Sequence, residues 1–272
     1  MSDLKRGISR RRVVKTGMAG ILATGVSPLI LSKAAWAQEF CNAPTGDTVT
    51  LGFNVPQTGA YADEGADELR AYQLAVEHLN GEGDGGLIPH FSSKTLTGSG
   101  ILGKRVEYVT GDTQTQSDPA RESARRMIER DGAVMITGGS SSGVAIAVQS
   151  LCQDMGIIFM AALTHSNDTT GKDKRKYGFR HFFNAYQSGV GLGPQLGAAY
   201  GNDRRAYHLT ADYTWGWTQE ESMIAATEAL GWETVETVRT PVGAGDFSQY
   251  ITPVLNSGAD VLILNHYGFD GI

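Results

Sequence analysis

Three consecutive serines form the segment of this chain that most resembles chemical machinery. They lie in Gly139-Ser140-Ser141-Ser142-Gly143, between a predicted strand over 133–137 and a predicted helix over 144–153. The segment matches G-x-S-x-G, the nucleophile elbow of serine hydrolases, in which Ser141 would be the nucleophile. The same serines could simply cap the helix. A third interpretation is a cradle, in which hydroxyls and free N–H groups at the helix N-terminus receive a ligand's carboxylate, carbonyl or amide oxygen. We favour the cradle because no histidine and acid stand out as triad partners.

Other polar loops follow predicted strands in the same way. Ligands of open α/β sheets bind beyond the carboxyl ends of the strands, so these loops should meet at one edge. Four aromatic side chains lie in or beside them: Tyr61, Tyr213, Trp215 and Tyr267. Aromatic walls with a few polar groups are typical of a small-molecule cleft.

The elements that would position these loops alternate between strand and helix along the chain. Short apolar runs alternating with helical patterns predict parallel, doubly wound sheets. The alternation breaks at a basic, loop-like stretch over 171–180 and then restarts, which predicts two lobes, over 38–183 and 184–272. We expect the second lobe to be incomplete at Ile272, because it then holds only three strands. The predicted strands are 49–55, 105–110, 133–137, 157–161, 205–210, 234–240 and 261–265, and the predicted helices are 67–79, 119–131, 144–153, 219–230 and 246–256.

The first 37 residues read as an export signal. Arg10, Arg11 and Arg12 resemble the twin-arginine consensus, a weakly apolar stretch follows over 17–31, and Ala35-Trp36-Ala37 ends the segment. A charged start, an apolar middle and an A-x-A end are typical of a cleaved signal, and the paired arginines indicate the route. A membrane anchor is the rival, but it needs about 18 consecutive apolar residues, and Gly and Ser interrupt this stretch. The mature chain should therefore begin near Gln38, be periplasmic and carry no membrane span.

Charge and cysteine content narrow the function further. Removing the signal leaves 16 basic and 28 acidic residues, a net charge of −12. Such an acidic protein is a poor candidate for binding nucleic acid, and the basic stretch over 171–180 is better explained as a solvated loop. No Cys/His cluster indicates a metal, and we expect no cofactor. Cys41 and Cys152 should fall at the same edge of the sheet, where they could form one disulfide or stay as two buried free thiols.

The chain from about residue 49 onward resembles the type I periplasmic substrate-binding proteins of ABC transporters, in the branched-chain amino acid, amide and urea group. Four segments carry the resemblance, and their order and spacing are more specific than any one alone. They are Leu51-Gly52-Phe53 through Thr58-Gly59-Ala60-Tyr61, the segment Ile136–Ser142, the segment Gly156–His165, and Asp212-Tyr213-Thr214-Trp215-Gly216.

The resemblance implies a two-lobed protein that closes about a hinge on a small ligand and delivers it to the permease subunits of an importer. It implies that the protein has no enzymatic activity. The alternatives to this function are a serine hydrolase and an extracytoplasmic ligand sensor. Ser142 would offer its hydroxyl to the ligand, and Thr164 would add contacts beside it. Glu64 stands where the family often has an aromatic ring. The ligand-binding residues implied are Tyr61, Glu64, Ser141, Ser142, Thr164, His165, Tyr186, Tyr213, Trp215 and Tyr267.

The family's amino-acid binders grip the ligand's amino group with an acidic residue that would follow Ile272. A glycine- and serine-rich insertion over about 83–100 is also longer than the usual loop. Because that acidic residue would lie beyond Ile272, the ligand class stays open between amino acids, amides, urea and small aromatic acids.

Overall fold

The structure is a computed structural model that describes residues 40–44, 46–82 and 97–272. The predicted export signal over 1–37 and most of the insertion over 83–100 lie outside the described residues. Residues 40–272 form one compact unit, and it contains two parallel sheets.

The first sheet has five parallel strands in the order β2-β1-β3-β4-β5. β1 is an interior strand, where Leu51 pairs with Tyr108 of β2 on one side and with Met135 of β3 on the other. Successive strands are joined by helices, as the alternation predicts. The elements are β1 (Thr48–Val55), α2 (Ala62–Leu79), β2 (Arg105–Asp112), α3 (Ser117–Glu129), β3 (Met135–Gly138), α4 (Ser142–Met155), β4 (Ile158–Ala161), a short 3-10 helix η3 (Asn167–Thr170) and β5 (Gly178–Arg180).

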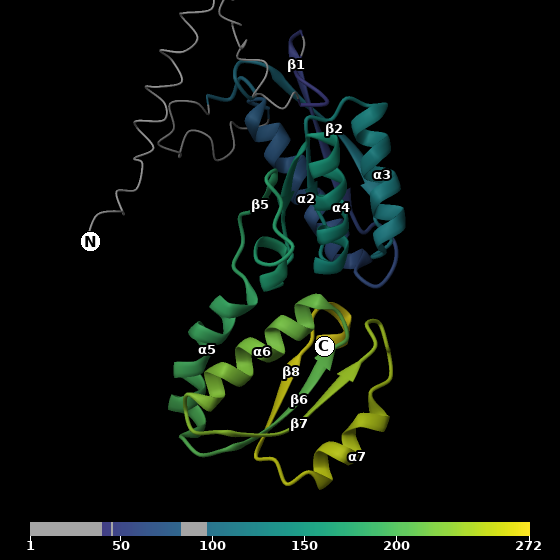
Figure 1. Ribbon diagram of the computed structural model, residues 1–272. Helices are drawn as coiled ribbons and strands as arrows, with labels where there is room; N and C mark the ends of the chain where they lie inside the picture. The colour runs from purple at the N-terminus through teal and green to yellow at the C-terminus, as the bar shows by residue number, and fades with distance from the viewer. Residues whose placement is uncertain (1–39, 45, 83–96) are drawn as a thin grey trace, which may run out of the picture. The chain divides into compact units, whose positions relative to one another are not determined.

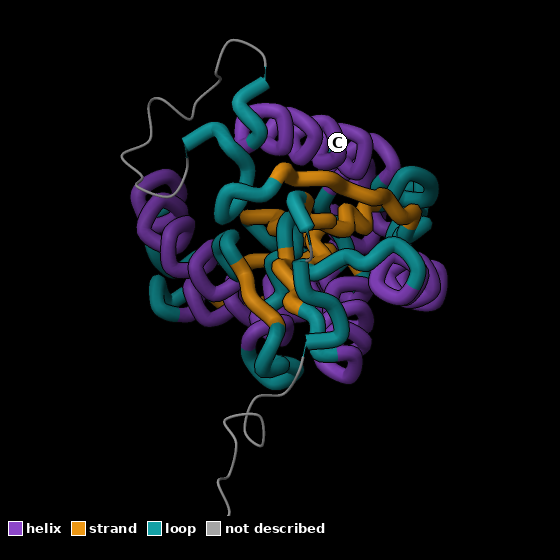
Figure 2. Tube along the Cα trace, turned by 90° about the horizontal axis from the view of Figure 1, so that it is seen from above, coloured by secondary structure: helices purple, strands orange, loops and turns teal. Residues whose placement is uncertain are grey.

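Helices cover both faces of this sheet (Figure 1). On one face α2 packs Val76 and Tyr72 against Leu51 and Phe53 of β1. On the other face α3 and α4 share an apolar core with β3 and β4, and Ile136 and Phe159 lie within it. Seen from above, the strands run between layers of helix (Figure 2). The doubly wound α/β class predicted from the sequence is confirmed.

The second sheet has three parallel strands in the order β7-β6-β8. Its core joins Ala206, Met223, Trp232 and Ile263, with Leu230 packed against them. Its elements are α5 (Ala185–Tyr200), β6 (Arg205–Ala211), α6 (Thr214–Glu228), β7 (Glu233–Thr240), α7 (Ser248–Asn256), β8 (Val261–Asn265) and a 3-10 helix η4 (Gly268–Gly271).

Helix α5 and strand β5 were not predicted. Several glycines and Pro194 lower the intrinsic helix propensity of α5. The helix forms because Gly189, Gly193 and Gly197 allow it to pack closely on α6 and the turn that follows it. An added Cβ at Gly189 would lie 2.5 Å from the Ser222 carbonyl oxygen, and one at Gly197 would lie 3.0 Å from Leu230. Asn184 starts the helix with a capping box. Close helix packing therefore outweighs propensity here.

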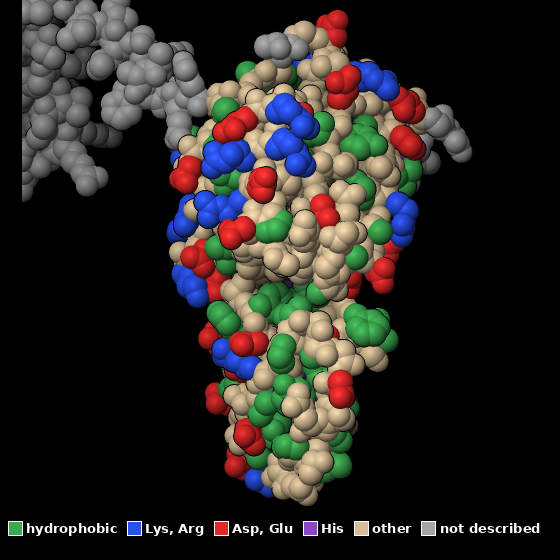
Figure 3. Space-filling model, turned by 90° about the vertical axis from the view of Figure 1, so that its right-hand side faces the viewer, with side chains coloured by type: hydrophobic (Ala, Val, Ile, Leu, Met, Phe, Trp, Pro, Cys, Tyr) green, Lys and Arg blue, Asp and Glu red, His purple; other side chains and the backbone are tan. Residues whose placement is uncertain are grey.

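The surface differs between the two sheets. Charged side chains of both signs are interspersed over the half that carries the first sheet, whereas apolar side chains gather over the half that carries the second (Figure 3). Exposed apolar residues there include Ile251 and Leu255 of α7 and Leu264 of β8. Among the helices that the structure describes, none has the length and apolar character needed to cross a membrane.

The disulfide that the sequence allowed is absent, because Cys41 and Cys152 are both free. Cys152 is fully buried in the core between α3, α4 and the sheet, while Cys41 is exposed. The alternative of two buried free thiols is correct for Cys152 only, because the Cys41 thiol is free but exposed.

Candidate functional site

The loops at the carboxyl ends of the strands bring four aromatic rings together. Tyr61 and Tyr213 each stand at the N-cap of the helix that follows their strand, α2 and α6. In each helix a glycine in the first turn allows the helix to approach the end of its strand closely. An added Cβ at Gly65 would lie 1.8 Å from the Pro56 carbonyl oxygen, and one at Gly216 would lie 2.0 Å from the Ala211 carbonyl oxygen. The two sheets therefore position these tyrosines by the same local device.

We call Tyr61, Tyr213, Trp215 and Tyr267 the aromatic cluster. Ring centroids lie 6.4 Å apart for Tyr61 and Tyr213, 5.9 Å for Tyr213 and Trp215, 6.2 Å for Trp215 and Tyr267, and 5.5 Å for Tyr267 and Tyr61. Each ring thus touches two others in a closed circuit. One ring comes from the first sheet and three from the second, as the strand-end argument predicted.

Burial dominates the electrostatics of this cluster. Tyr61 is 2% exposed, and burial raises the pKa of its hydroxyl to about 12. Tyr213 is partly exposed as a residue, but its hydroxyl lies in the interior beside Tyr61, and burial raises its pKa well above the usual value. All three tyrosines, Tyr267 included, therefore stay neutral at physiological pH.

The serine loop lies at the end of β3, where Gly138 and Gly139 have φ of +118° and +96°. Ser141 is the N-cap of α4, but its side chain makes no capping hydrogen bond. Ser142 is fully buried, and its Oγ accepts a 3.1 Å hydrogen bond from the Ser166 backbone amide. The serines therefore do not act as simple caps, and the hydroxyl proton of Ser142 can still be donated.

The loop after β4 carries Thr164 and His165. Thr164 is fully buried, and its Oγ1 has no hydrogen-bond partner among the described residues. His165 faces elsewhere: Nδ1 lies 2.8 Å from the Phe183 carbonyl oxygen, its ring packs on Phe182 and Phe183, and burial lowers its pKa. Thr164 is thus a candidate ligand contact, whereas His165 supports the segment that leads to α5.

Arg180 fixes this loop, a role that the sequence did not indicate. Its guanidinium donates to the carbonyl oxygens of Thr164 and Ser166, both at 2.5 Å. The interpretation of the whole basic stretch as a solvated loop is therefore wrong for Arg180. Lys172, by contrast, is exposed to solvent, and its ammonium lies 2.7 Å from Asp168.

Glu68 is a buried acid that the sequence reasoning missed. It lies on α2, where one oxygen accepts from the Tyr72 hydroxyl at 2.8 Å and the other from the Gly139 amide at 3.2 Å. Burial raises its pKa to about 7. Its spacing from Tyr72, Val76 and Leu79 places it on the buried stripe of the helix, which was the available signal.

Glu64 lies half-buried one turn earlier on the same helix. An added Cβ at Gly268 would lie 2.3 Å from its Oε1 and 3.2 Å from the Tyr61 ring, so the backbone after β8 runs against both. Asp270 in η4 accepts from the Gly243 amide at 2.6 Å. Besides burial, the carboxylates of Asp270 and Glu64 raise the pKa of Tyr61, and those of Glu64 and Glu68 raise the pKa of Tyr267. Of these three acids, only Glu64 was predicted to take part in the site.

Polar contacts also join the first sheet's last loop to α6. Ser166 Oγ lies 3.0 Å from Thr214 Oγ1, and the Thr214 hydroxyl donates to Asp168 at 2.9 Å. The backbone amide of Asn167 donates to Thr218 Oγ1 at 3.2 Å. Ser166 lies two residues after Thr164, and Thr214 directly precedes Trp215. A shift of α6 would therefore change the positions of both Thr164 and Trp215.

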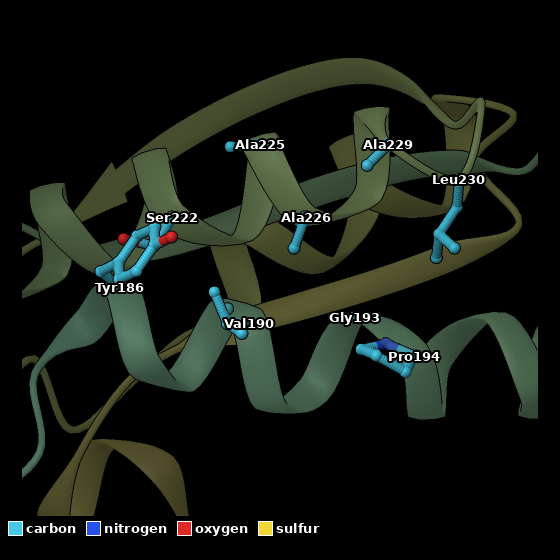
Figure 4. A pocket seen from close by; sticks show the side chains of 10 residues that line it. Tyr186, Val190, Gly193, Pro194, Ser222, Ala225, Ala226, Ala229 and Leu230 are labelled. Atoms are coloured by element: carbon cyan, nitrogen blue, oxygen red, sulfur yellow. The ribbon is translucent and has the colours of Figure 1, made fainter.

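Tyr186 does not join the aromatic cluster. It is 64% exposed on α5 and lines a separate apolar groove of about 500 Å³ between α5 and α6 (Figure 4). Val190, Pro194, Ala226 and Leu230 form much of its wall. This groove offers few polar groups to a small polar ligand.

The nucleophile elbow finds no support in the geometry. Such a site needs a histidine within hydrogen-bond reach of the serine hydroxyl. Within 40–44, 46–82 and 97–272, no hydrogen bond joins Ser141 to a histidine, and His165 is engaged with Phe183. The arrangement is suited to holding a ligand through hydroxyls, rings and carboxylates.

Two parallel sheets thus meet through their strand-end loops, where aromatic and polar side chains gather. A family model described as "Periplasmic binding protein" matches residues 48–272. The chain belongs to this family, as a type I periplasmic binding protein.

Several known proteins resemble the chain. The "Leu/Ile/Val-binding protein homolog 7" of Brucella abortus is 21% identical over 237 residues, covering 85% of this chain and 55% of the relative. An "Amino acid binding protein" of Pseudomonas aeruginosa is 26% identical over 244 residues, covering 89% and 58%. A periplasmic binding protein from Burkholderia mallei superposes with a TM-score of 0.71 at 25% identity, covering 84% and 56%.

A solute-binding protein from Rhodopseudomonas palustris, solved with 3,4-dihydroxybenzoic acid, has a TM-score of 0.67 at 21% identity, covering 80% of this chain and 54% of that one. The chain thus spans about half the length of the relatives it matches.

Proposed function

We propose that this protein is an extracytoplasmic solute-binding protein that captures a small polar ligand and delivers it to the permease subunits of an ABC importer. The observation that carries the proposal is the aromatic cluster, in which Tyr61 from one sheet meets Tyr213 and Tyr267 from the other. A ligand held there contacts both sheets, and so favours the closed arrangement of two lobes over 38–183 and 184–272. The protein acts by binding and without catalysis.

The ligand class includes amino acids, amides, urea and related acids, aromatic acids among them. The hydroxyls of Ser142 and Thr164 and the N-terminus of α4 suit a carboxylate or carbonyl oxygen. The aromatic cluster suits the remainder of the ligand. Relatives whose names refer to amino acids, and a structural neighbour holding a dihydroxybenzoic acid, support the same range. Export by the twin-arginine route to the periplasm is part of this proposal.

A thermal-shift screen of the purified protein against amino acids, amides, urea and aromatic acids tests the function. We expect at least one class to raise the Tm in a concentration-dependent way. Trp215→Ala combined with Ser142→Ala should remove that shift, whereas Trp217→Ala should keep it, because Trp217 packs under Arg239 away from the cluster. An unchanged affinity in the double variant would contradict the site, and ester turnover lost in Ser141→Ala would favour the hydrolase.

A further inference from the structure

Helix α6 of the proposed second lobe carries a stripe of hydroxyl side chains that faces the proposed first lobe. Thr214, Thr218 and Ser222 lie four residues apart, so they share one face of the helix. Thr218 and Ser222 are buried on that face. Their partner is the loop over 166–168, which follows the candidate ligand residue Thr164. We call the contact between this stripe, this loop and the start of α5 the polar interface.

Asn167 bonds to two helices across the polar interface. Its backbone amide donates to Thr218 Oγ1, and its side-chain Nδ2 donates to Ser222 Oγ, both at 3.2 Å. Its Oδ1 accepts a 2.9 Å hydrogen bond from the backbone amide of Tyr186 in the first turn of α5. Ser222 Oγ is free to accept, because its own proton goes to the Thr218 carbonyl oxygen at 2.6 Å. One side chain of the first lobe therefore fixes both α5 and α6.

The same loop is fixed to the first lobe through Ser166. The Ser166 backbone amide donates to Ser142 Oγ at 3.1 Å, and Ser166 Oγ lies 3.0 Å from Thr214 Oγ1. The Arg180 guanidinium donates to the Ser166 carbonyl oxygen. Since Ser166 is fully buried, a path of hydrogen bonds runs through the interior from Ser142 to the helix that carries Trp215. A displacement of α6 would break bonds at the loop that holds the candidate ligand residues.

The bonds of the polar interface join protein atoms to protein atoms, so they form whether or not a ligand is bound. Each such bond adds only modestly to stability, but these bonds lie on one face of one helix and form together. The aromatic cluster adds an apolar contact between the same lobes, because Tyr61 is buried against Tyr213 and Tyr267. The closed arrangement therefore satisfies its own polar groups.

We propose that the polar interface holds the two lobes closed before a ligand binds, with Asn167 as the main positioning residue. This inference rests on the proposed function, in which closure serves ligand capture, and it adds how closure is controlled. A ligand would select a closed state that is already populated. Its apparent affinity would fall in proportion to any loss of the closed fraction.

Pulsed electron spin resonance on the ligand-free protein measures the distance between the lobes. One spin label is attached to the exposed Cys41, and the other to the cysteine introduced by Glu228→Cys at the exposed end of α6. The buried thiol of Cys152 stays unlabelled in the folded protein. We expect one main distance that matches the structure, with longer distances in a minority.

A main population at longer distances would overturn the inference and leave the proposed function standing, because no ligand enters the measurement. A failed compound screen with a closed ligand-free protein would count against the proposed function alone, and the polar interface would stand.

Two asparagine variants separate the polar interface from the general stability of α5. Asn167→Ala should raise the open fraction at least threefold, because it removes the side-chain bonds to Tyr186 and Ser222. Asn184→Ala is the matched control, since Asn184 also accepts from an amide in the first turn of α5, and its hydrogen bonds among the described residues stay within that turn. We expect Asn184→Ala to lower the Tm and leave the distance unchanged. Equal lengthening in both variants would contradict the role of Asn167.

Thr214→Val keeps the question open to test if Asn167→Ala does not fold. Valine has nearly the shape of threonine but lacks the hydroxyl that donates to Asp168 and lies beside Ser166. This variant should also raise the open fraction. Circular dichroism establishes folding, and a folded variant of either kind with a lower Tm but an unchanged distance distribution would show a merely structural role and overturn the inference.

Discussion

The backbone amide of Gly139 donates a 3.2 Å hydrogen bond to the buried carboxylate of Glu68, although 71 residues separate them in the chain. The bond ties helix α2 to the serine loop at the end of β3. A buried acid at this point makes the stability of the protein and the position of the loop depend on one titrating group.

Glu68 should make the protein less stable as the pH rises. Its folded-state pKa is raised to about 7 from 4.5, so the folded chain holds a proton that the unfolded chain releases. Stability contributed by this proton is fully present below about pH 4.5, falls between 4.5 and 7, and is lost above that, with a limit of roughly 3 kcal/mol.

Glu68→Gln should flatten this dependence, since the amide does not titrate. Urea unfolding of both proteins at pH 5 and pH 8 measures it. The wild-type protein should lose more stability between the two pH values than the variant does. Parallel losses would show that Glu68 does not titrate in that window.

Arg180 should control the loop that carries Thr164. Its guanidinium is half-buried and donates to two carbonyl oxygens, and burial lowers its pKa. Arg180→Lys keeps the positive charge but loses the planar guanidinium that donates to both carbonyl oxygens at once. We therefore expect a cost of about 1–3 kcal/mol in the free energy of unfolding and weaker ligand binding. Arg175→Lys is the control, because within the described part of the chain the Arg175 guanidinium bonds only to carbonyls one and two residues away. Equal effects from both substitutions would show that the two hydrogen bonds from the Arg180 guanidinium are not needed to hold the loop.

The glycines of α5 should differ in their tolerance of alanine. A Cβ at Gly189 meets the Ser222 carbonyl oxygen at 2.5 Å, whereas one at Gly191 meets nothing within 4 Å. Gly189→Ala should therefore destabilise the protein by about 1–3 kcal/mol through overpacking. Gly191→Ala should stabilise it by up to about 1 kcal/mol, because alanine favours the helix. Denaturant midpoints decide the question, and a gain in both variants would mean that α5 and α6 are not packed closely.

The two cysteines should react separately. Burial raises the pKa of the Cys152 thiol to about 12, while Cys41 is exposed. Iodoacetamide should label Cys41 in the native protein and Cys152 only after unfolding. Intact mass measurement counts the labels, and two protected cysteines with a mass 2 Da below the reduced protein would reveal a disulfide instead.

The sequence by itself determined the alternation of strands and helices and the places where strands end. Strand 261–265 was predicted at the bounds that β8 has, and Tyr61, Tyr213, Trp215 and Tyr267 were selected because they follow strand ends. Parallel strands put those ends at one edge, so local pattern is enough to gather the loops.

Only the tertiary structure decided which side chains meet across those loops. Tyr186 and His165 lie near the predicted site in the chain, yet they face the α5–α6 groove and the Phe182–Phe183 segment. Glu68 and Arg180 act on loops distant in the sequence, through burial and through carbonyl oxygens that no local pattern reveals. The partners of a side chain depend on how the helices pack. The spacing of apolar residues in the sequence shows which face of a helix is buried, but it does not show which residues that face contacts.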